Sequence, residues 1–204
     1  NPYDHRFWNR DTFNGRHRAV ITTTIQVPVG RGRRYLSGAP AAVDQFLGGW
    51  GLTTVSHFNS GQFFSPAFSG ADPSNTNTVG GLPDRLCDGN LPRGERTIAR
   101  WFEPACFVAP PAGRFGNSGV NVLKRPGYNL HHLSVAKEFQ LSERFKLEYV
   151  ASVANVFNHP HFAPPRNNIS VANPGQITSV LFGADLSIDG TVAREVGMTL
   201  RLTW

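Results

Sequence analysis

Several side chains are of types that bind metal ions, and their spacing indicates whether they could form a metal site. Histidines occur as the pairs His131-His132 and His159-Pro-His161, and imidazole nitrogens are common metal ligands. The segment from Asp185 to Gly190 has the carboxylates of a calcium loop, but neither its spacing nor its terminal Glu. Neither pattern is diagnostic, because such residues also form ordinary loops and turns. We therefore predict no metal site and no cofactor.

Catalysis would require a nucleophile beside a base, or paired carboxylates in a cleft. No such combination can be named from the sequence. The turn Gly30-Arg-Gly32-Arg-Arg does not complete a phosphate-binding glycine loop, and no helix is predicted to follow it. We therefore predict no catalytic residue and a chain that is not an enzyme.

The two cysteines, Cys87 and Cys106, lie in a stretch rich in Pro, Gly and Asn. A lone pair in such a loop is typical of a disulfide that forms outside the cytoplasm. Zinc is the alternative, but it would need further ligands, and neither CxxC spacing nor a pair of histidines stands nearby. We predict a Cys87–Cys106 disulfide.

Composition narrows the fold and the partners. The chain of 204 residues contains 21 Gly and 15 Pro, a density that interrupts helices and excludes a helical bundle. Its formal net charge is +6. Its basic residues are spread along the chain, with one cluster at 31–34, so we predict no nucleic-acid partner. Because the sequence opens Asn1-Pro2-Tyr3 rather than with methionine, we expect a cut product of a longer chain.

Strict alternation of apolar and polar side chains predicts five long strands, which would lie antiparallel in an all-β fold. The clearest is the last, where Val196, Met198, Leu200, Leu202 and Trp204 share one face. We expect one β-rich segment over 1–204. Its predicted strands cover 18–27, 49–59, 128–139, 145–157 and 193–204.

Strand length and loop length together indicate a membrane barrel. A tilted strand of about 9 to 11 residues crosses a bilayer, whereas strands of soluble proteins usually have about 5 or 6 residues. Barrels also have short periplasmic turns and long outer loops. The short turn at 141–144 then places the long irregular loops 60–127 and 158–192 outside. The 28–48 connection falls on the periplasmic side, where Arg31, Arg33 and Arg34 would meet anionic head groups.

Aromatic residues near the strand ends favour the same interpretation, because barrels carry aromatic girdles at both water interfaces. A soluble ligand-binding β-sandwich, with these aromatic side chains in its core, remains an alternative. The predicted interface aromatics are Trp50, Phe139, Phe145 and Trp204 at the periplasmic end, and Phe58 and Phe157 at the outer end.

Several motifs, taken in order along the chain, resemble the C-terminal end of TonB-dependent outer-membrane receptors, in particular the Oar-like, carboxypeptidase-regulatory-domain group. The final residue of that family is usually Phe, and Trp204 still supplies a terminal aromatic side chain. The motifs are Gly48-Gly-Trp50, Asn59-Ser-Gly61-Gln62, Gly113-Arg-Phe-Gly-Asn-Ser-Gly119, Arg125-Pro-Gly127, Phe139-Gln-Leu-Ser-Glu-Arg-Phe145, Asn155-Val-Phe-Asn-His-Pro160 and Leu202-Thr-Trp204.

The resemblance implies a parent receptor that imports a bulky ligand through a barrel of about 22 strands. Five strands cannot close a barrel, so both edges of the sheet need partners. Other strands of a longer chain could supply them in the outer membrane, with lipid or detergent around the wall. Alternatively, a released extracellular fragment would pair edge to edge with identical copies and form a filament or tube. Such copies could also order the long loops.

Overall fold

The structure is a computed structural model that describes residues 15–181 and 193–204. The chain divides into two compact units, whereas the sequence indicated one continuous β-rich segment. The sheet unit comprises the described residues 19–58, 129–160 and 193–204, and the loop unit comprises 15–18, 59–128 and 161–181. The division arises because the two long connections pack with each other.

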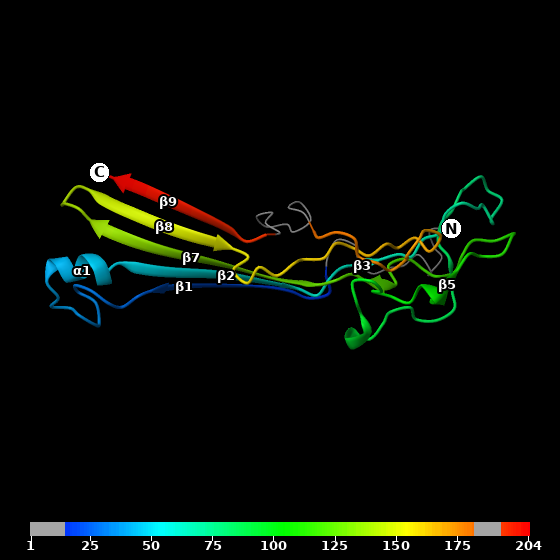
Figure 1. Cartoon of the computed structure of the whole chain (residues 1–204), viewed down its shortest axis with the longest axis horizontal. Helices are drawn as coiled ribbons and strands as arrows, with labels where there is room; N and C mark the ends of the chain where they lie inside the picture. Colours follow the sequence, from blue (N-terminus) through cyan, green and yellow to red (C-terminus); the bar gives the residue numbers. More distant parts are fainter. Residues whose placement is uncertain (1–14, 182–192) are drawn as a thin grey trace. The chain divides into compact units, whose positions relative to one another are not determined.

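A five-stranded sheet with strand order β1-β2-β7-β8-β9 forms the sheet unit (Figure 1). The β7–β8 and β8–β9 pairs are antiparallel in continuous register. Thr24 and Thr53 face each other across β1 and β2, and the Val27 N–H donates to the Trp50 carbonyl, so this pair is also antiparallel. The strands are β1 (Arg18–Gln26), β2 (Trp50–Asn59), β7 (Tyr128–Gln140), β8 (Lys146–Ala154) and β9 (Glu195–Thr203).

Four of the five predicted ranges contain their strand, β7 extends one residue beyond its range to Gln140, and the largest difference lies at the end of β8. We predicted a strand to residue 157, but β8 ends at Ala154. The next residue, Asn155, has φ +47°, a left-handed conformation that breaks the extended backbone. The Asn155 side chain bonds both backbone groups of His159, at 3.0 and 3.1 Å, which fixes the turn.

The 28–48 connection contains a short helix, α1 (Ala41–Leu47), that the sequence did not predict. It lies at the end of the sheet where β2 begins (Figure 1). Asp44 holds the preceding turn against it, because its carboxylate accepts the Arg31 backbone N–H at 2.6 Å. Helix α1 has seven residues and no side-chain N-cap, so its packing against the connection stabilises it more than its own propensity does.

The loop unit consists of short elements joined by long turns. Strand β3 (Phe63–Phe64) pairs with β6 (Leu123–Lys124), and β4 (Asp84–Arg85) pairs with β5 (Phe107–Val108). Two single-turn helices, η2 (Arg93–Glu95) and η3 (Pro104–Cys106), complete it. Phe64, Phe102, Cys106, Phe107 and Leu123 form its buried core.

Segment 161–181 packs onto segment 59–128 through backbone hydrogen bonds. The Ile169 N–H donates to the Ala67 carbonyl at 2.8 Å, and the Trp101 N–H donates to the Gly175 carbonyl at 2.9 Å. We had expected that neighbouring copies could order these loops. In the structure, each loop supplies the other with packing partners within one chain, and ordering by neighbouring copies stays a prediction.

Gly61 and Gly127 explain why two of the motifs contain glycine. Gly61 has φ +83°, and a Cβ there would lie 2.4 Å from the Arg125 carbonyl oxygen. A Cβ on Gly127 would lie 2.4 Å from the Asn59 carbonyl oxygen. The motifs at 59–62 and 125–127 therefore pack backbone to backbone, at a distance that a side chain would prevent.

Within residues 15–181 and 193–204, no helix is long and apolar enough to cross a membrane.

Candidate functional site: the two faces of the sheet and the loop unit

One face of the sheet is apolar, and the strand register defines it. Leu147, Tyr149, Ala151 and Val153 of β8 lie opposite Leu202, Leu200, Met198 and Val196 of β9. On the other side of β8, the same four residues pair with Phe139, Lys137, Val135 and Leu133 of β7. We call these twelve residues the apolar face. Those on β9 are well exposed, with Met198 at 71% and Leu200 at 67%, so this face is not the core of a folded unit.

The opposite face carries small and polar side chains. Ser134 and Ser152 share a hydrogen bond of 3.1 Å across β7 and β8. The carboxylate of Glu148 lies 3.7 Å from the guanidinium of Arg201 across β8 and β9. Such cross-strand polar pairs suit a wetted surface. The sheet therefore has two chemically different faces across β7, β8 and β9.

The predicted interface aromatics gather at opposite ends of the sheet. Trp50 begins β2, and Phe139 lies near the end of β7. Phe145 directly precedes β8 and Trp204 directly follows β9, so both lie at that same end of the sheet. At the other end, Phe58 and Phe157 both pack edge to face on His131, with ring centroids 5.4 and 5.1 Å away. Both groups lie where girdles would be required, and their contact with the membrane interface stays a prediction.

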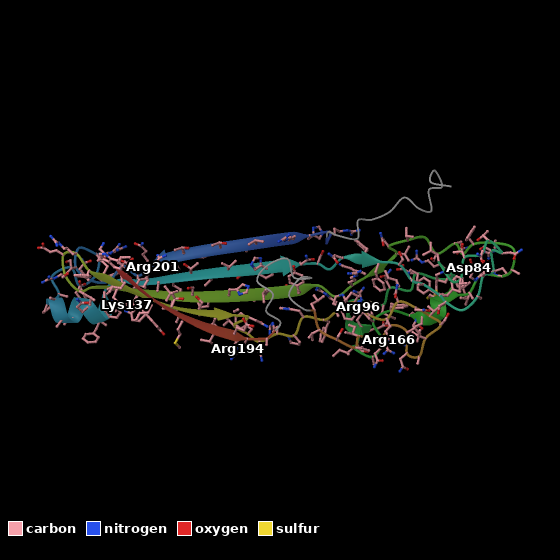
Figure 2. The ribbon with its side chains drawn as sticks, turned by 90° about the horizontal axis from the view of Figure 1, so that it is seen from above. Asp84, Arg96, Lys137, Arg166, Arg194 and Arg201 are labelled. Carbon is pink, nitrogen blue, oxygen red and sulfur yellow. A yellow bond between two sulfur atoms is a disulfide. The ribbon has the colours of Figure 1, made fainter. Side chains whose placement is uncertain are left out.

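Lys137 is the residue of the apolar face that sequence reasoning handled least well. We treated it as an interruption of the apolar pattern, but its side chain is only 2% exposed. Its ammonium lies 5.5 Å from the Trp50 ring centroid and 5.0 Å from that of Phe139, and it donates to the Gly48 carbonyl (Figure 2). Lys137 therefore extends its charge to the α1 end of the sheet and keeps its aliphatic part on the apolar face.

The three arginines of the turn before α1 contact other groups of the same chain. The Arg31 side chain donates to the Ala39 carbonyl at 3.1 Å, and Arg33 donates to Gln26 at 3.2 Å. Arg34 lies over the Tyr35 ring at 5.6 Å. All three arginines remain exposed. Their contact with anionic head groups therefore stays a prediction.

In the loop unit the predicted disulfide is confirmed. Cys87 and Cys106 are bonded, with their Cα atoms 4.9 Å apart. The bond joins the turn after β4 to η3, and Cys106 itself belongs to the buried core. It therefore fixes the outer turns of the loop unit to its hydrophobic centre.

Asp84 is a second anchor of the loop unit, which sequence reasoning missed. It is 6% exposed and accepts bonds from both terminal nitrogens of Arg114, at 2.8 and 2.5 Å, and from the Asn117 N–H at 3.1 Å. Arg114 and Asn117 belong to the Gly113–Gly119 motif, which therefore wraps around this carboxylate. The hydrogen bond from Arg114 holds the pKa of Asp84 below its ordinary value of 3.8, against the opposing effect of burial.

We expect Asp84→Asn to destabilise the loop unit by about 2 kcal/mol near neutral pH, because Arg114 loses its charged partner. A carboxylate whose pKa is lower in the folded state stabilises the fold above its unfolded pKa and loses this effect as pH falls through the folded value. The difference from wild type should therefore shrink below about pH 3.8. Hydrogen exchange of the Ser118 amide, which donates to the Pro83 carbonyl, measures it.

The matched control for this prediction is Asp88→Asn. Asp88 pairs with Arg85, but its side chain is 72% exposed. Exposed ion pairs contribute little, so this change should leave Ser118 exchange nearly unaltered. Equal effects of the two substitutions, or a difference from wild type that does not depend on pH, would show that Asp84 is not an anchor.

The histidines do not come together as a metal centre. Within the described ranges, no group of three or more His, Cys, Asp and Glu side chains could hold a metal ion. His57 and His132 meet edge to face at 5.7 Å, and His131 shares a hydrogen bond of 2.9 Å with Ser56. The calcium-like segment 185–190 lies outside the described residues.

A sheet of long antiparallel strands, apolar on one face and polar on the other, is the architecture of a barrel wall. Among the described strands, β1 and β9 form its two edges, so this part of the wall is open. A family model described as an outer membrane beta barrel domain matches residues 1–195. The chain belongs to this family and forms a wall segment of an outer-membrane barrel. Searches of curated proteins and of solved structures find no match.

Proposed function

We propose that the chain is the C-terminal part of the barrel wall of a TonB-dependent receptor, similar to the Oar-like group, and that this receptor imports a bulky ligand. The observation that carries the proposal is the two-faced, open sheet. We infer the transport function from the resemblance of the motifs to those receptors.

In this proposal the apolar face contacts lipid and the polar face lines the lumen. Val196, Met198 and Leu200 have exposed apolar side chains. Transfer of such side chains from water to hydrocarbon is favourable, so contact with lipid stabilises them and contact with water does not. The Glu148–Arg201 pair and the Ser134–Ser152 hydrogen bond suit a water-filled interior. The wall contributes surface to uptake and no catalytic group.

The edge strands need partners in any of the candidate functions. All nine residues of β1 and all nine of β9 are exposed. In the receptor, other strands of the same wall would pair with them. The open edges also fit the second candidate, a released extracellular fragment that adds identical copies strand to strand in a filament. A soluble sandwich fits less well, because it would bury the apolar face under a second sheet.

The mass and location of the native polypeptide test this proposal. We expect the sequence within a chain much larger than 22.4 kDa, in the outer-membrane fraction and soluble only with detergent. We also expect that chain to crosslink to TonB in living cells. A monomer of 22.4 kDa that stays in plain buffer would contradict the proposal. Filaments in electron micrographs of the purified material would instead support the second candidate.

A further inference from the structure

The loop unit carries a cluster of positive charges around two aromatic rings. The Arg16 guanidinium lies 5.9 Å from the Phe63 ring centroid, and Phe63 pairs with Lys124 across β3 and β6. The Trp101 indole N–H donates to the Lys124 carbonyl at 2.8 Å. Arg96, labelled in Figure 2, lies 5.6 Å from the Trp101 ring centroid. A chain of direct contacts therefore links Arg16, Lys124 and Arg96.

Within residues 15–181 and 193–204, these cations have no acidic partner. Among the described residues, no carboxylate forms a salt bridge with Arg16, Arg93, Arg96 or Lys124. Arg93 and Glu95 lie on the same short helix η2, but no ion pair joins them. By contrast, Arg85, Arg100 and Arg114 of the same unit each pair with an acidic residue. Unneutralised charge is therefore concentrated at one place in the loop unit.

The clustered positive charges disfavour the charged forms of the two half-buried residues, Lys124 and Arg96. Burial lowers the pKa of Lys124, and the positive charges of Arg96, Arg16 and Arg93 lower it further. Burial, followed by the charge of Arg93, likewise lowers the pKa of Arg96. The charges of Arg16, Arg93 and Arg96 thus act on Lys124, and that of Arg93 acts on Arg96. Bringing like charges together costs free energy that a bound anion would recover.

The side chains that surround this charge match a particular ligand chemistry. A guanidinium offers a planar fork of donors that fits phosphate and sulfate oxygens, and a lysine adds a point charge. Trp101 holds Arg96 on its ring, and the Arg96 Nε donates to the Leu91 carbonyl at 2.7 Å, so this fork is already oriented. Orientation before binding reduces the entropy that a ligand must overcome.

We propose that Arg16, Arg93, Arg96 and Lys124 form an anion-binding site for phosphate or sulfate groups carried by a larger ligand. The inference goes beyond the proposed function and does not depend on it, because binding can be measured without transport. We infer phosphate or sulfate because the guanidinium groups offer paired donors for their oxygens, and because the aromatic rings hold these groups in place. Soluble polyphosphates and the phosphorylated head groups of outer-membrane lipid share this chemistry.

Titration calorimetry of the full-length protein in neutral detergent tests the site, with inositol hexakisphosphate as the soluble probe. We expect saturable binding that weakens steeply with salt, because phosphate contacts release counterions. Vesicles with or without phosphorylated lipid A form the second arm. Binding to both probes would indicate a general phosphate site, and binding to the vesicles alone would assign the site to lipid. Failure to bind either probe would overturn the proposal.

Substitutions locate the binding. Arg96→Gln combined with Lys124→Gln should lower the affinity about tenfold or more, because two charge-assisted contacts are lost. Arg93→Gln is the second variant, since this exposed side chain can be changed without disturbing the fold, and it should lower the affinity about threefold to tenfold. The control is Arg100→Gln, whose charge Glu103 already neutralises at 3.4 Å. An equal loss of affinity in the control, or none in Arg93→Gln, would contradict the proposed location.

Discussion

Leu200→Arg should destabilise the protein in a phospholipid bilayer by about 2 to 4 kcal/mol, the cost of a charged side chain at mid-depth on a lipid-facing strand. Leu200 lies in the middle of β9, pairs with Tyr149 on the apolar face and is 67% exposed. Because Leu200 is well exposed among the described residues, the larger side chain should displace no described core residue, and the effect should come from contact with hydrocarbon. Urea-induced unfolding of the protein in phosphatidylcholine vesicles measures it.

Thr199→Arg is the matched control, because it places the same charge one residue earlier on the same strand. Thr199 pairs with Val150, and the alternation of β9 turns it to the polar face. A charge facing a water-filled lumen should change the free energy of unfolding by less than about 0.5 kcal/mol. If the two variants were equally unstable, or the order were reversed, the lipid-facing assignment of the apolar face would be wrong.

Phe102→Ala should destabilise the loop unit by about 3 to 5 kcal/mol, as large-to-small changes of aromatic residues in a core do. Phe102 is 1% exposed and meets Phe64 and Phe107 edge to face, each at a centroid distance of 6.0 Å. Its removal would leave a cavity at the centre of the core. Hydrogen exchange of the Trp101 and Ile177 amides, which bond across the two long connections, should accelerate accordingly.

Phe115→Ala removes the same ring from an exposed position of the same unit, where the side chain is 62% exposed, and should have little effect. Protection of the β8 and β9 amides should stay unchanged in Phe102→Ala, because the described core residues that pack with Phe102 lie in the loop unit. Equal acceleration of exchange in β8 and β9 would show that the two units unfold together.

The long strands were predictable because their signal is local. A side chain on a strand alternates between faces whatever the neighbours are, so the pattern of β9 alone indicates which residues share a surface. The observed register then placed Leu200 beside Tyr149, and Met198 beside Ala151, on that same face. The ends of the strands were less predictable, since Asn155 ends β8 through its own backbone conformation.

The loop unit was not predictable, because its interactions join residues that are far apart in the sequence. Ala67 bonds Asn167 and Ile169, about one hundred residues later. Asp84 meets Arg114 across thirty residues, and each looks like an ordinary surface charge in the sequence. Irregular loops have no periodicity from which such pairings could be read.

The sequence by itself determined the all-β class, the five long strands, the two-faced wall and the disulfide, since each depends on alternation, composition or a single pair of residues. Only the tertiary structure decided that the two long connections form one unit, that Lys137 lies between Trp50 and Phe139, and that Arg16, Arg93, Arg96 and Lys124 gather together. The physical reason is that these contacts close long loops. Their partners are selected by packing and charge in three dimensions, which local sequence patterns do not encode.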